Sequence, residues 1–408
     1  MKRAFRRAKR GVALAGAAVL MTSFLVACGE SGDGGGSGAA ETYTIGYVGA
    51  LTGPFGASGV IALNGLKAGV DYVNTLDGPK FELVSRDTKG DPSAGANLAR
   101  EVAQSGVGAI YAGTQDIAAM QPVLNQYRVL AADAGGITAI LPKIGDDKEF
   151  PWTFCPNPAC GPNGIVPQLR FVSEIGDGKV GELSDAGPYG AGMTALTESV
   201  VKEQFPDMEI VRESFPISAT SVTSQLQKLR DAGAETLLLW TYGAPLVMVM
   251  QNLDRMGWYP YIGAPLGAGD PSVVDATPEG LKGKIAAGGI AKTQVQGSQK
   301  SEVAKAFYDG YAKAGGVDIN SFKSLDTVGS YSFDWAVVLH AAIKGAGSTE
   351  PEKVKDWLTA GNTVEGAQGP LTFGKSGEER IGLSLDDTTV YDPSQPCSDG
   401  QCAPMKTP

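Results

Sequence analysis

The sequence has one histidine, His340, in 408 residues, and this scarcity excludes several classes of enzyme. A single histidine cannot supply an HExxH zinc site or a pair of histidine metal ligands. The chain also lacks the G-x-S-x-G motif of many serine hydrolases and the G-x-x-x-x-G-K-[ST] phosphate loop. Its adjacent acids, Asp146-Asp147 and Asp386-Asp387, are typical of solvated turns rather than of an acid/base pair. We therefore expect that the protein is not an enzyme and that it has no catalytic residue, no bound metal and no cofactor.

Basic residues are also few, and they are unevenly placed. The chain has 34 lysines and arginines against 44 acids, and its first ten residues, MKRAFRRAKR, hold six of the basic side chains. Without those six, 28 basic residues face 44 acids, a net charge near −16. This balance argues against binding nucleic acid and against binding an anionic membrane by charge.

Long apolar runs are absent except near the N-terminus. The basic start is followed by the apolar or small residues Val12 to Ala27, which indicates a secretory signal peptide over residues 1–27. The ending Leu25-Val26-Ala27-Cys28 resembles a bacterial lipobox, which implies that Cys28 becomes a lipid-bearing first residue. A transmembrane anchor is the alternative, and Arg6-Arg7 leaves Sec and twin-arginine export open. Residues 28–41 then read as the lipidated cysteine and a flexible Gly/Ser tether.

Four cysteines remain after Cys28, in two local pairs. Cys155 and Cys160 flank Pro-Asn-Pro-Ala, and Cys397 and Cys402 flank Ser-Asp-Gly-Gln. In an exported protein these turn-forming loops favour two local disulfides, although four cysteines allow three pairings. A four-cysteine metal site is the alternative, and the wide spacing within each pair argues against it.

Most of the chain alternates short apolar runs with helical segments, which predicts parallel sheets built from βαβ units. The first run, Tyr43 to Ala50, reads as a buried strand, and a helix follows a glycine-rich loop with Ser58 as its N-cap. Gly288-Gly289 reads as a passage between lobes, and Gly382–Tyr391 as a last strand. Other predicted strands are 80–86, 107–112, 129–132, 179–183, 209–215, 235–240 and 261–264; other predicted helices are 92–105, 115–127, 190–205, 221–232, 244–256, 302–314, 328–344 and 352–361.

Three segments carry a family resemblance. Gly49-Ala50-Leu51-Thr52-Gly53-Pro54 with Asn64-Gly65, Gly90-Asp91-Pro92, and Gly369-Pro370-Leu371-Thr372-Phe373-Gly374 resemble type I extracytoplasmic solute-binding proteins. The nearest group is the branched-chain amino acid and amide receptors of ABC importers. A dinucleotide-binding domain is the alternative, but these glycines do not spell G-x-G-x-x-G.

The resemblance implies an α/β clamshell of two lobes, each a mostly parallel sheet flanked by helices, joined by three hinge crossings. The first lobe then comprises residues 42–160 and 290–374. The second comprises 161–289, and 375–408 supplies a hinge return, a second-lobe strand and a disulfide-bearing tail.

In this family, loops at the strand carboxyl ends of both lobes bind the ligand. On the first lobe the matching residues are Phe55, Ser58, Thr114, Gln115, Asp116, Gly135, Gly136 and Thr138. On the second lobe they are Tyr189, Trp240 and Tyr242. Solvated turns are the alternative for the first set, and core packing is the alternative for Trp240. The family's ammonium-binding acid should fall near Ile262–Leu266, where the chain has none, so an amino acid ligand requires a substitute such as Asp270 or Asp116.

We therefore expect a monomeric, lipid-anchored receptor on the outer face of the cell membrane. It would capture a branched-chain amino acid, another amino acid or a related amide and deliver it to an ABC permease. A receptor for a carboxylate, an aromatic acid or urea, and a ligand-sensing module that signals through a membrane partner, are the alternatives.

Overall fold

The computed structural model describes residues 42–53, 56–113, 117–133, 144–146, 149–176 and 178–406. Over these residues, no helix is both long enough and apolar enough to cross a bilayer. The described chain forms two open sheets with helices on both faces of each, together with one small hairpin.

The first sheet has the strand order β2-β1-β3-β4, and all of its strands are parallel. Side chains alternate between its faces, as the period of a strand requires. Ile45 and Tyr47 of β1 pack toward α1, α9 and α10, whereas Val48 packs toward α2 and α3. The elements of this first lobe are β1 (Thr42–Gly49), α1 (Gly56–Val73), β2 (Lys80–Asp87), α2 (Pro92–Gln104), β3 (Ala109–Ala112), α3 (Ile117–Tyr127), β4 (Leu130–Asp133), α9 (Glu302–Gly315), α10 (Gly329–Ala346), α11 (Pro351–Leu358), β10 (Thr363–Glu365) and β11 (Pro370–Thr372).

The second sheet has the order β12-β9-β8-β7-β5-β6, with only β12 antiparallel. Leu237 and Leu239 of β7 pack with α6 and α7, and Leu238 and Trp240 pack with α4 and α5. The elements of this second lobe are α4 (Val166–Ile175), β5 (Lys179–Asp185), α5 (Pro188–Gln204), β6 (Ile210–Phe215), α6 (Thr223–Asp231), β7 (Ala234–Trp240), α7 (Ala244–Met256), β8 (Tyr261–Pro265), α8 (Pro271–Ala276), β9 (Ile285–Ala291) and β12 (Thr388–Tyr391).

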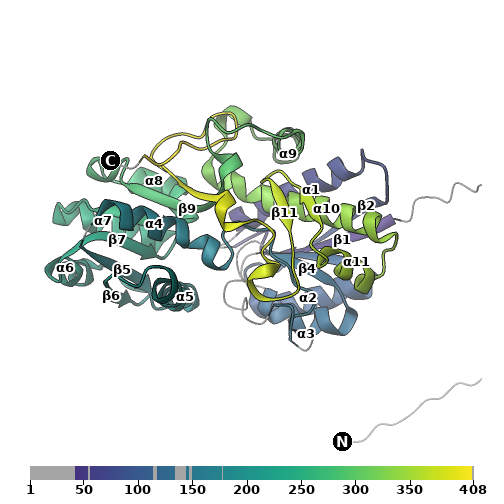
Figure 1. The fold of residues 1–408 in the computed structure, drawn as a ribbon, viewed down its shortest axis with the longest axis horizontal. Coiled ribbons are helices and arrows are strands. Elements are labelled where there is room, and N and C mark those ends of the chain that lie inside the picture. The colour runs from purple at the N-terminus through teal and green to yellow at the C-terminus, as the bar shows by residue number, and fades with distance from the viewer. Residues whose placement is uncertain are drawn as a thin grey trace, which may run out of the picture. The chain divides into compact units, whose positions relative to one another are not determined.

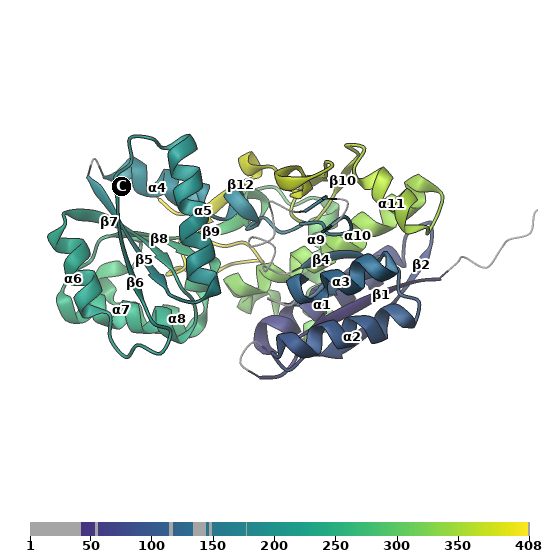
Figure 2. The same cartoon turned by 90° about the horizontal axis from the view of Figure 1, so that it is seen from below.

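The chain passes between the two sheets three times. The first crossing lies between β4 and α4, the second between β9 and α9, and the third between β11 and β12. Figures 1 and 2 show the C-terminal strand β12, in yellow, lying beside β9 although the two are far apart in sequence. The two-lobed α/β fold with three crossings agrees with the sequence-based expectation.

The passage predicted at Gly288-Gly289 is wrong, because both glycines lie inside β9. They are needed there for packing rather than for a turn. A Cβ at Gly288 would lie 2.0 Å from the amide of Gln168, which is buried beneath the strand, and one at Gly289 would lie 2.8 Å from Ala159. The second crossing begins only after Ala291.

Two other expectations need correction, and two helices were not predicted. Ser58 is not an N-cap, because α1 already begins at Gly56. The last strand is confined to Thr388–Tyr391, since the predicted strand Gly382–Tyr391 contains a short 3₁₀ turn at Leu385–Asp387. The helices that were not predicted are α4 and α8, which are both short and both have a proline in their first turn.

Both disulfides are local. Cys155 pairs with Cys160 in the first crossing, and Cys397 pairs with Cys402 in the C-terminal tail. Of the three possible pairings, this is the one that the loop spacing favoured.

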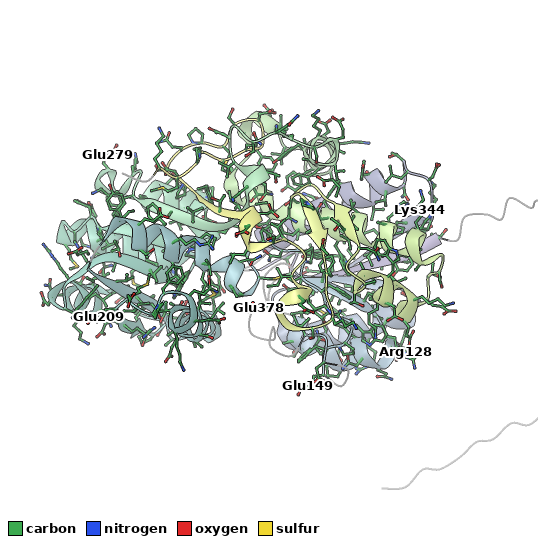
Figure 3. The ribbon with its side chains drawn as sticks, in the orientation of Figure 1. Arg128, Glu149, Glu209, Glu279, Lys344 and Glu378 are labelled. Carbon is green, nitrogen blue, oxygen red and sulfur yellow. A yellow bond between two sulfur atoms is a disulfide. The ribbon has the colours of Figure 1, made fainter. Side chains whose placement is uncertain are left out.

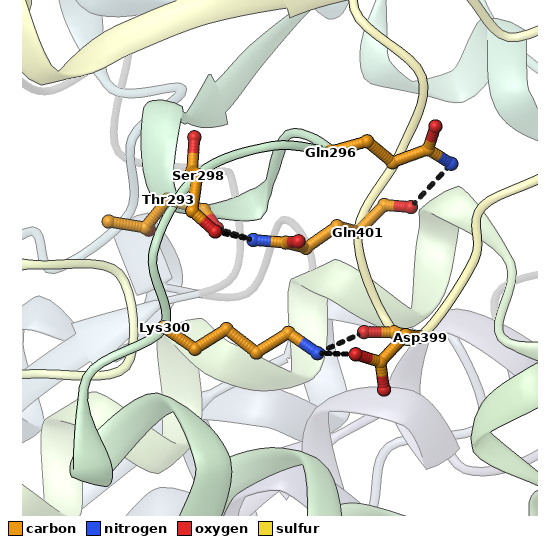
Figure 4. A network of polar contacts seen from close by, with 6 residues as sticks. All are labelled: Thr293, Gln296, Ser298, Lys300, Asp399 and Gln401. Atoms are coloured by element: carbon orange, nitrogen blue, oxygen red, sulfur yellow. Dashed lines mark hydrogen bonds and ion pairs between the residues drawn. The ribbon is translucent and has the colours of Figure 1, made fainter.

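The C-terminal tail is fastened to the second crossing (Figure 4). Gln401 donates from Nε2 to the carbonyls of Thr293 at 2.8 Å and Ser298 at 2.9 Å. Lys300 Nζ lies 2.6 Å from Asp399 Oδ2 and 4.8 Å above the ring of Tyr308. The C-terminal tail therefore adds hydrogen bonds and an ion pair that fix the position of residues 293–300.

A second set of contacts joins the crossings to the first lobe. Asp334 of α10, which is fully buried, accepts from the backbone N–H of Ala367 at 2.6 Å and of Gln368 at 3.1 Å. The Gln368 side chain donates both to Asp334 at 2.8 Å and to the carbonyl of Pro156 in the first crossing at 3.1 Å. Thr293 of the second crossing donates to the Gln368 carbonyl at 2.8 Å. One buried carboxylate thus positions a turn that contacts two crossings.

The third crossing passes close to the second lobe at Glu378, labelled in Figure 3. Burial raises the pKa of this carboxyl, and the negative charge of Glu203 on α5 raises it further. The two acids come from different lobes, so their repulsion acts between the lobes.

Candidate functional site

Five of the twelve residues predicted to bind ligand lie in the described part of the chain. They are Ser58, Tyr189, Trp240, Tyr242 and Asp270. The other seven fall outside the described residues: Phe55, Thr114, Gln115, Asp116, Gly135, Gly136 and Thr138. The geometry of the site is therefore built from the second lobe and from one loop of the first.

Strands β5 and β7 lie side by side in the second sheet, with Ser184 opposite Trp240, and end at the same edge. Helix α5 begins immediately after β5, with Pro188 in its first turn. The turn is tight, because a Cβ at Gly190 would lie 2.0 Å from the carbonyl oxygen of Asp185. Glycine at position 190 therefore allows the start of α5, which carries Tyr189, to pack closely against the end of β5.

Tyr189 and Tyr242 meet at this edge. Their ring centroids are 5.0 Å apart with an interplanar angle of 89°, an edge-to-face contact. Both side chains are half-buried, so each keeps part of its surface open. Desolvation raises the pKa of the Tyr189 hydroxyl, and the nearby Tyr242 and Asp185 raise it further. Tyr189 is therefore neutral at physiological pH and can offer a ring face and a hydroxyl to a ligand.

Trp240 is placed differently from these tyrosines. Its side chain is wholly buried in the core formed with α4 and α5, and its indole Nε1–H has no hydrogen-bond partner among the described residues. In this structure the side chain packs in the core, which was the alternative left open by the sequence.

Asp270 caps α8. Its Oδ1 accepts from the backbone N–H of Ser272 at 2.8 Å and from the Ser272 hydroxyl at 2.5 Å. This oxygen satisfies N–H groups at the start of a helix, the ordinary role of an aspartate in that position.

On the first lobe, Ser58 lies half-buried in the first turn of α1, next to the loop Leu51–Gly53. Asp87, at the end of β2, holds this loop by accepting from Leu51 N at 2.8 Å and from the Thr52 hydroxyl at 2.7 Å. Desolvation alone would raise the pKa of Asp87, but hydrogen bonds from Leu51, Thr52 and Lys89 outweigh it and lower the pKa to about 2. The Asp87 carboxylate therefore stays ionised, and keeps its hydrogen bonds to the loop Leu51–Gly53, down to low pH.

Sequence reasoning missed Asp185, the last residue of β5, which lies beside Tyr189. Two features could have revealed it. It lies two residues after the predicted strand 179–183, and it precedes by four residues the tyrosine that the family pattern singled out.

The described residues contain no group of three or more His, Cys, Asp or Glu able to hold a metal ion. His340 is buried in α10 beside Phe81, away from the strand ends that carry the tyrosines. Burial lowers the pKa of His340, and Lys344 and Lys80 lower it further. What the strand-end residues offer is recognition: aromatic faces, hydroxyls and one carboxylate.

Comparison with known proteins agrees with a role in ligand recognition. The periplasmic binding protein family matches residues 42–381. The Leu/Ile/Val-binding protein homolog 3 of Brucella melitensis is 25% identical over 353 residues, covering 84% of this chain and 90% of that protein.

Solved structures show the same fold. A leucine-binding protein LivK from Thermotoga maritima aligns with a TM-score of 0.66 at 20% identity, covering 82% of this chain and 92% of the other. LivJ from Streptococcus pneumoniae, in complex with isoleucine, aligns with a TM-score of 0.62 at 20% identity, covering 86% and 100%. These relatives are solute-binding proteins rather than enzymes, and their fold is the expected type I clamshell. Because the family match spans well over half of the chain, the protein belongs to the periplasmic binding protein family.

Proposed function

We propose that this protein captures a branched-chain or related amino acid outside the cytoplasm and delivers it to an ABC importer. The observation that carries the proposal is the half-buried pair Tyr189–Tyr242 at the carboxyl ends of β5 and β7. Ligands of open α/β sheets bind at this edge, and partly exposed aromatic rings there supply apolar surface with a polar tip. The names of the relatives, which include Leu/Ile/Val-binding proteins, support the choice of solute.

The first lobe would supply the other half of the site. We propose that the predicted residues of its loops, from Phe55 to Thr138, bind the solute together with the tyrosine pair. A hinge with three crossings suits this division, because contacts with both lobes stabilise the closed form over the open one.

Thermal unfolding of the purified protein with candidate solutes tests the proposal. A bound ligand at about 100 times its Kd stabilises the native state by about 2.7 kcal/mol, which should raise Tm by a few degrees. We expect shifts with leucine, isoleucine or valine. Tyr189→Ala should weaken the same binding by roughly 5- to 150-fold, the loss of about 1–3 kcal/mol that follows removal of a central aromatic contact.

The alternatives predict other results. A shift only with carboxylates, aromatic acids or urea would replace the amino acid by a solute without an amine. Unchanged affinity in Tyr189→Ala, with Tm in the absence of ligand also unchanged, would move the site away from this edge of the second sheet.

We also propose that Cys28, after cleavage of residues 1–27, carries a lipid that anchors the protein to the outer face of the cell membrane. Residues 29–41 would tether the folded part near the permease. Cys28→Ser should abolish labelling of the protein by radioactive palmitate and release it from the membrane fraction or leave its signal uncleaved. Labelling of this variant at the wild-type level would exclude Cys28 as the lipid site.

A further inference from the structure

The carboxylate of Asp185 is in an unusual environment. It ends β5, opposite Phe215 of β6, and only 4% of its surface is exposed. Aspartates are seldom buried to this degree unless a cation pairs with them. Among the described residues, no lysine or arginine forms an ion pair with Asp185.

Among the described residues, only one of the two carboxylate oxygens of Asp185 accepts a hydrogen bond. Oδ1 accepts from the backbone N–H of Gly187 at 2.9 Å, at the start of α5. The positive end of the helix dipole partly offsets the charge there. This is the only hydrogen bond to the side chain among the described residues, so Oδ2 still has its capacity to accept.

The surroundings of Asp185 suit a cation. Tyr189 and Tyr242 lie at the same strand ends, and Asp185 is close enough to Tyr189 for its charge to act on the hydroxyl. Aromatic faces attract cations, and a carboxylate with a free oxygen can accept a charge-assisted hydrogen bond. Asp185 is thus the acidic side chain that lies beside the tyrosine pair at these strand ends.

We infer that Asp185 is the carboxylate that pairs with the ammonium group of the bound amino acid, with Tyr189 and Tyr242 beside it. The inference rests on the proposed function, since only an amine-bearing solute brings the cation. It assigns the role to a residue that the sequence pattern did not single out, in place of Asp270, whose side chain is only partly buried and caps α8.

Asp185→Asn separates this role from a structural one. The asparagine oxygen can still accept from Gly187 N, so the turn into α5 is kept while the charge is removed. Binding of isoleucine and of 2-hydroxy-3-methylpentanoate, its analogue with a hydroxyl in place of the ammonium, is measured by calorimetry on the full-length protein. We expect Asp185→Asn to weaken isoleucine binding by at least about 30-fold and to change binding of the hydroxy acid by less than about 3-fold.

Asp270→Asn is the matched control and should leave the preference for isoleucine over the hydroxy acid unchanged. Unchanged isoleucine affinity in Asp185→Asn overturns the inference while leaving the proposed function intact. An equal loss for both ligands, with a lower Tm, also overturns it and assigns Asp185 a structural role. Binding to the wild-type protein is measured first. If the wild type binds no amino acid, both the proposed function and this inference are wrong.

Discussion

Gly65→Ala should lower the free energy of unfolding by about 3 kcal/mol or more, and the variant should be recovered poorly or unfolded. A Cβ at this position would lie 1.9 Å from the carbonyl oxygen of Gly329 and 2.6 Å from the Ser332 hydroxyl. Overpacking by a single group typically costs about 1–3 kcal/mol when side chains can shift. Here the nearest atom belongs to the backbone of α10, so a whole helix has to move.

Relaxation of that helix is opposed on several sides. The Ser332 hydroxyl donates to the Ala62 carbonyl of α1 at 2.7 Å, which ties the two helices at this level. One turn further along α1, a Cβ at Gly69 would lie 2.8 Å from the carbonyl of Phe333. A Cβ at Gly329 would in turn lie 2.5 Å from the ring of Tyr311 on α9. Separating α1 from α10 would therefore disturb much of the first lobe's core.

Gly192→Ala provides the matched control, because Gly192 lies within α5 and a Cβ there would meet nothing within 4 Å. Alanine at an open helical position should be neutral or stabilising by up to about 1 kcal/mol. Urea unfolding followed by circular dichroism compares the two variants with the wild type. Equal stability of Gly65→Ala and Gly192→Ala would mean that the close approach of α1 and α10 is not required.

Gly65 also illustrates how far the sequence could be interpreted. Its place after Asn64 matched a family pattern, but nothing near it in sequence reveals that its partner is Gly329. The alternation of short apolar runs with helical segments was enough to predict the strands and helices themselves. Residues 244–256 form α7 with the predicted bounds, and the predicted strand 80–86 differs from β2 by one residue.

Glycines were harder to interpret than apolar runs. The pair Gly288-Gly289 predicts a break between elements, because glycine pairs commonly mark turns and loops. In β9 they instead make room for Gln168 and Ala159, and such long-range packing leaves no local signal. The residues of the candidate site also differ in how far the sequence predicts them. The motif predicts Tyr189, whereas Asp185 becomes notable only once its burial is seen, together with the absence of an ion pair to it among the described residues.

Asp334→Ala should lower the free energy of unfolding by about 3–5 kcal/mol near pH 5. The substitution leaves three N–H groups without their acceptor, the backbone donors of Ala367 and Gln368 and the side-chain amide of Gln368. Each buried donor left unsatisfied costs about 1–3 kcal/mol. The turn should also release its hold on Pro156 and Thr293, so that ligand affinity falls together with stability.

The effect should depend on pH in a direction set by the buried carboxyl. Burial raises the pKa of Asp334 to about 7 from about 3.8, against the hydrogen bonds from Ala367 and Gln368, which lower it, while Glu365 adds to the rise. The folded protein thus holds this proton more tightly than the unfolded chain. The contribution to stability is complete below about pH 3.8 and is lost as the pH rises to about 7. Alanine cannot titrate, so the cost of the substitution should shrink with rising pH.

Unfolding by urea at pH 5 and pH 8, for the wild type and for Asp334→Ala, measures this directly. At about 1.4 kcal/mol per pH unit, the cost should be about 2–3 kcal/mol smaller at pH 8 than at pH 5. Asp356→Ala, which removes an exposed carboxylate of α11, should change stability by less than about 0.5 kcal/mol at either pH. A cost for Asp334→Ala that is the same at both values would show that the carboxyl has one charge state throughout this range. A cost no larger than that of Asp356→Ala would mean that the turn at Gln368 does not depend on Asp334. The crossings would then be held by the disulfide loop and the C-terminal tail instead.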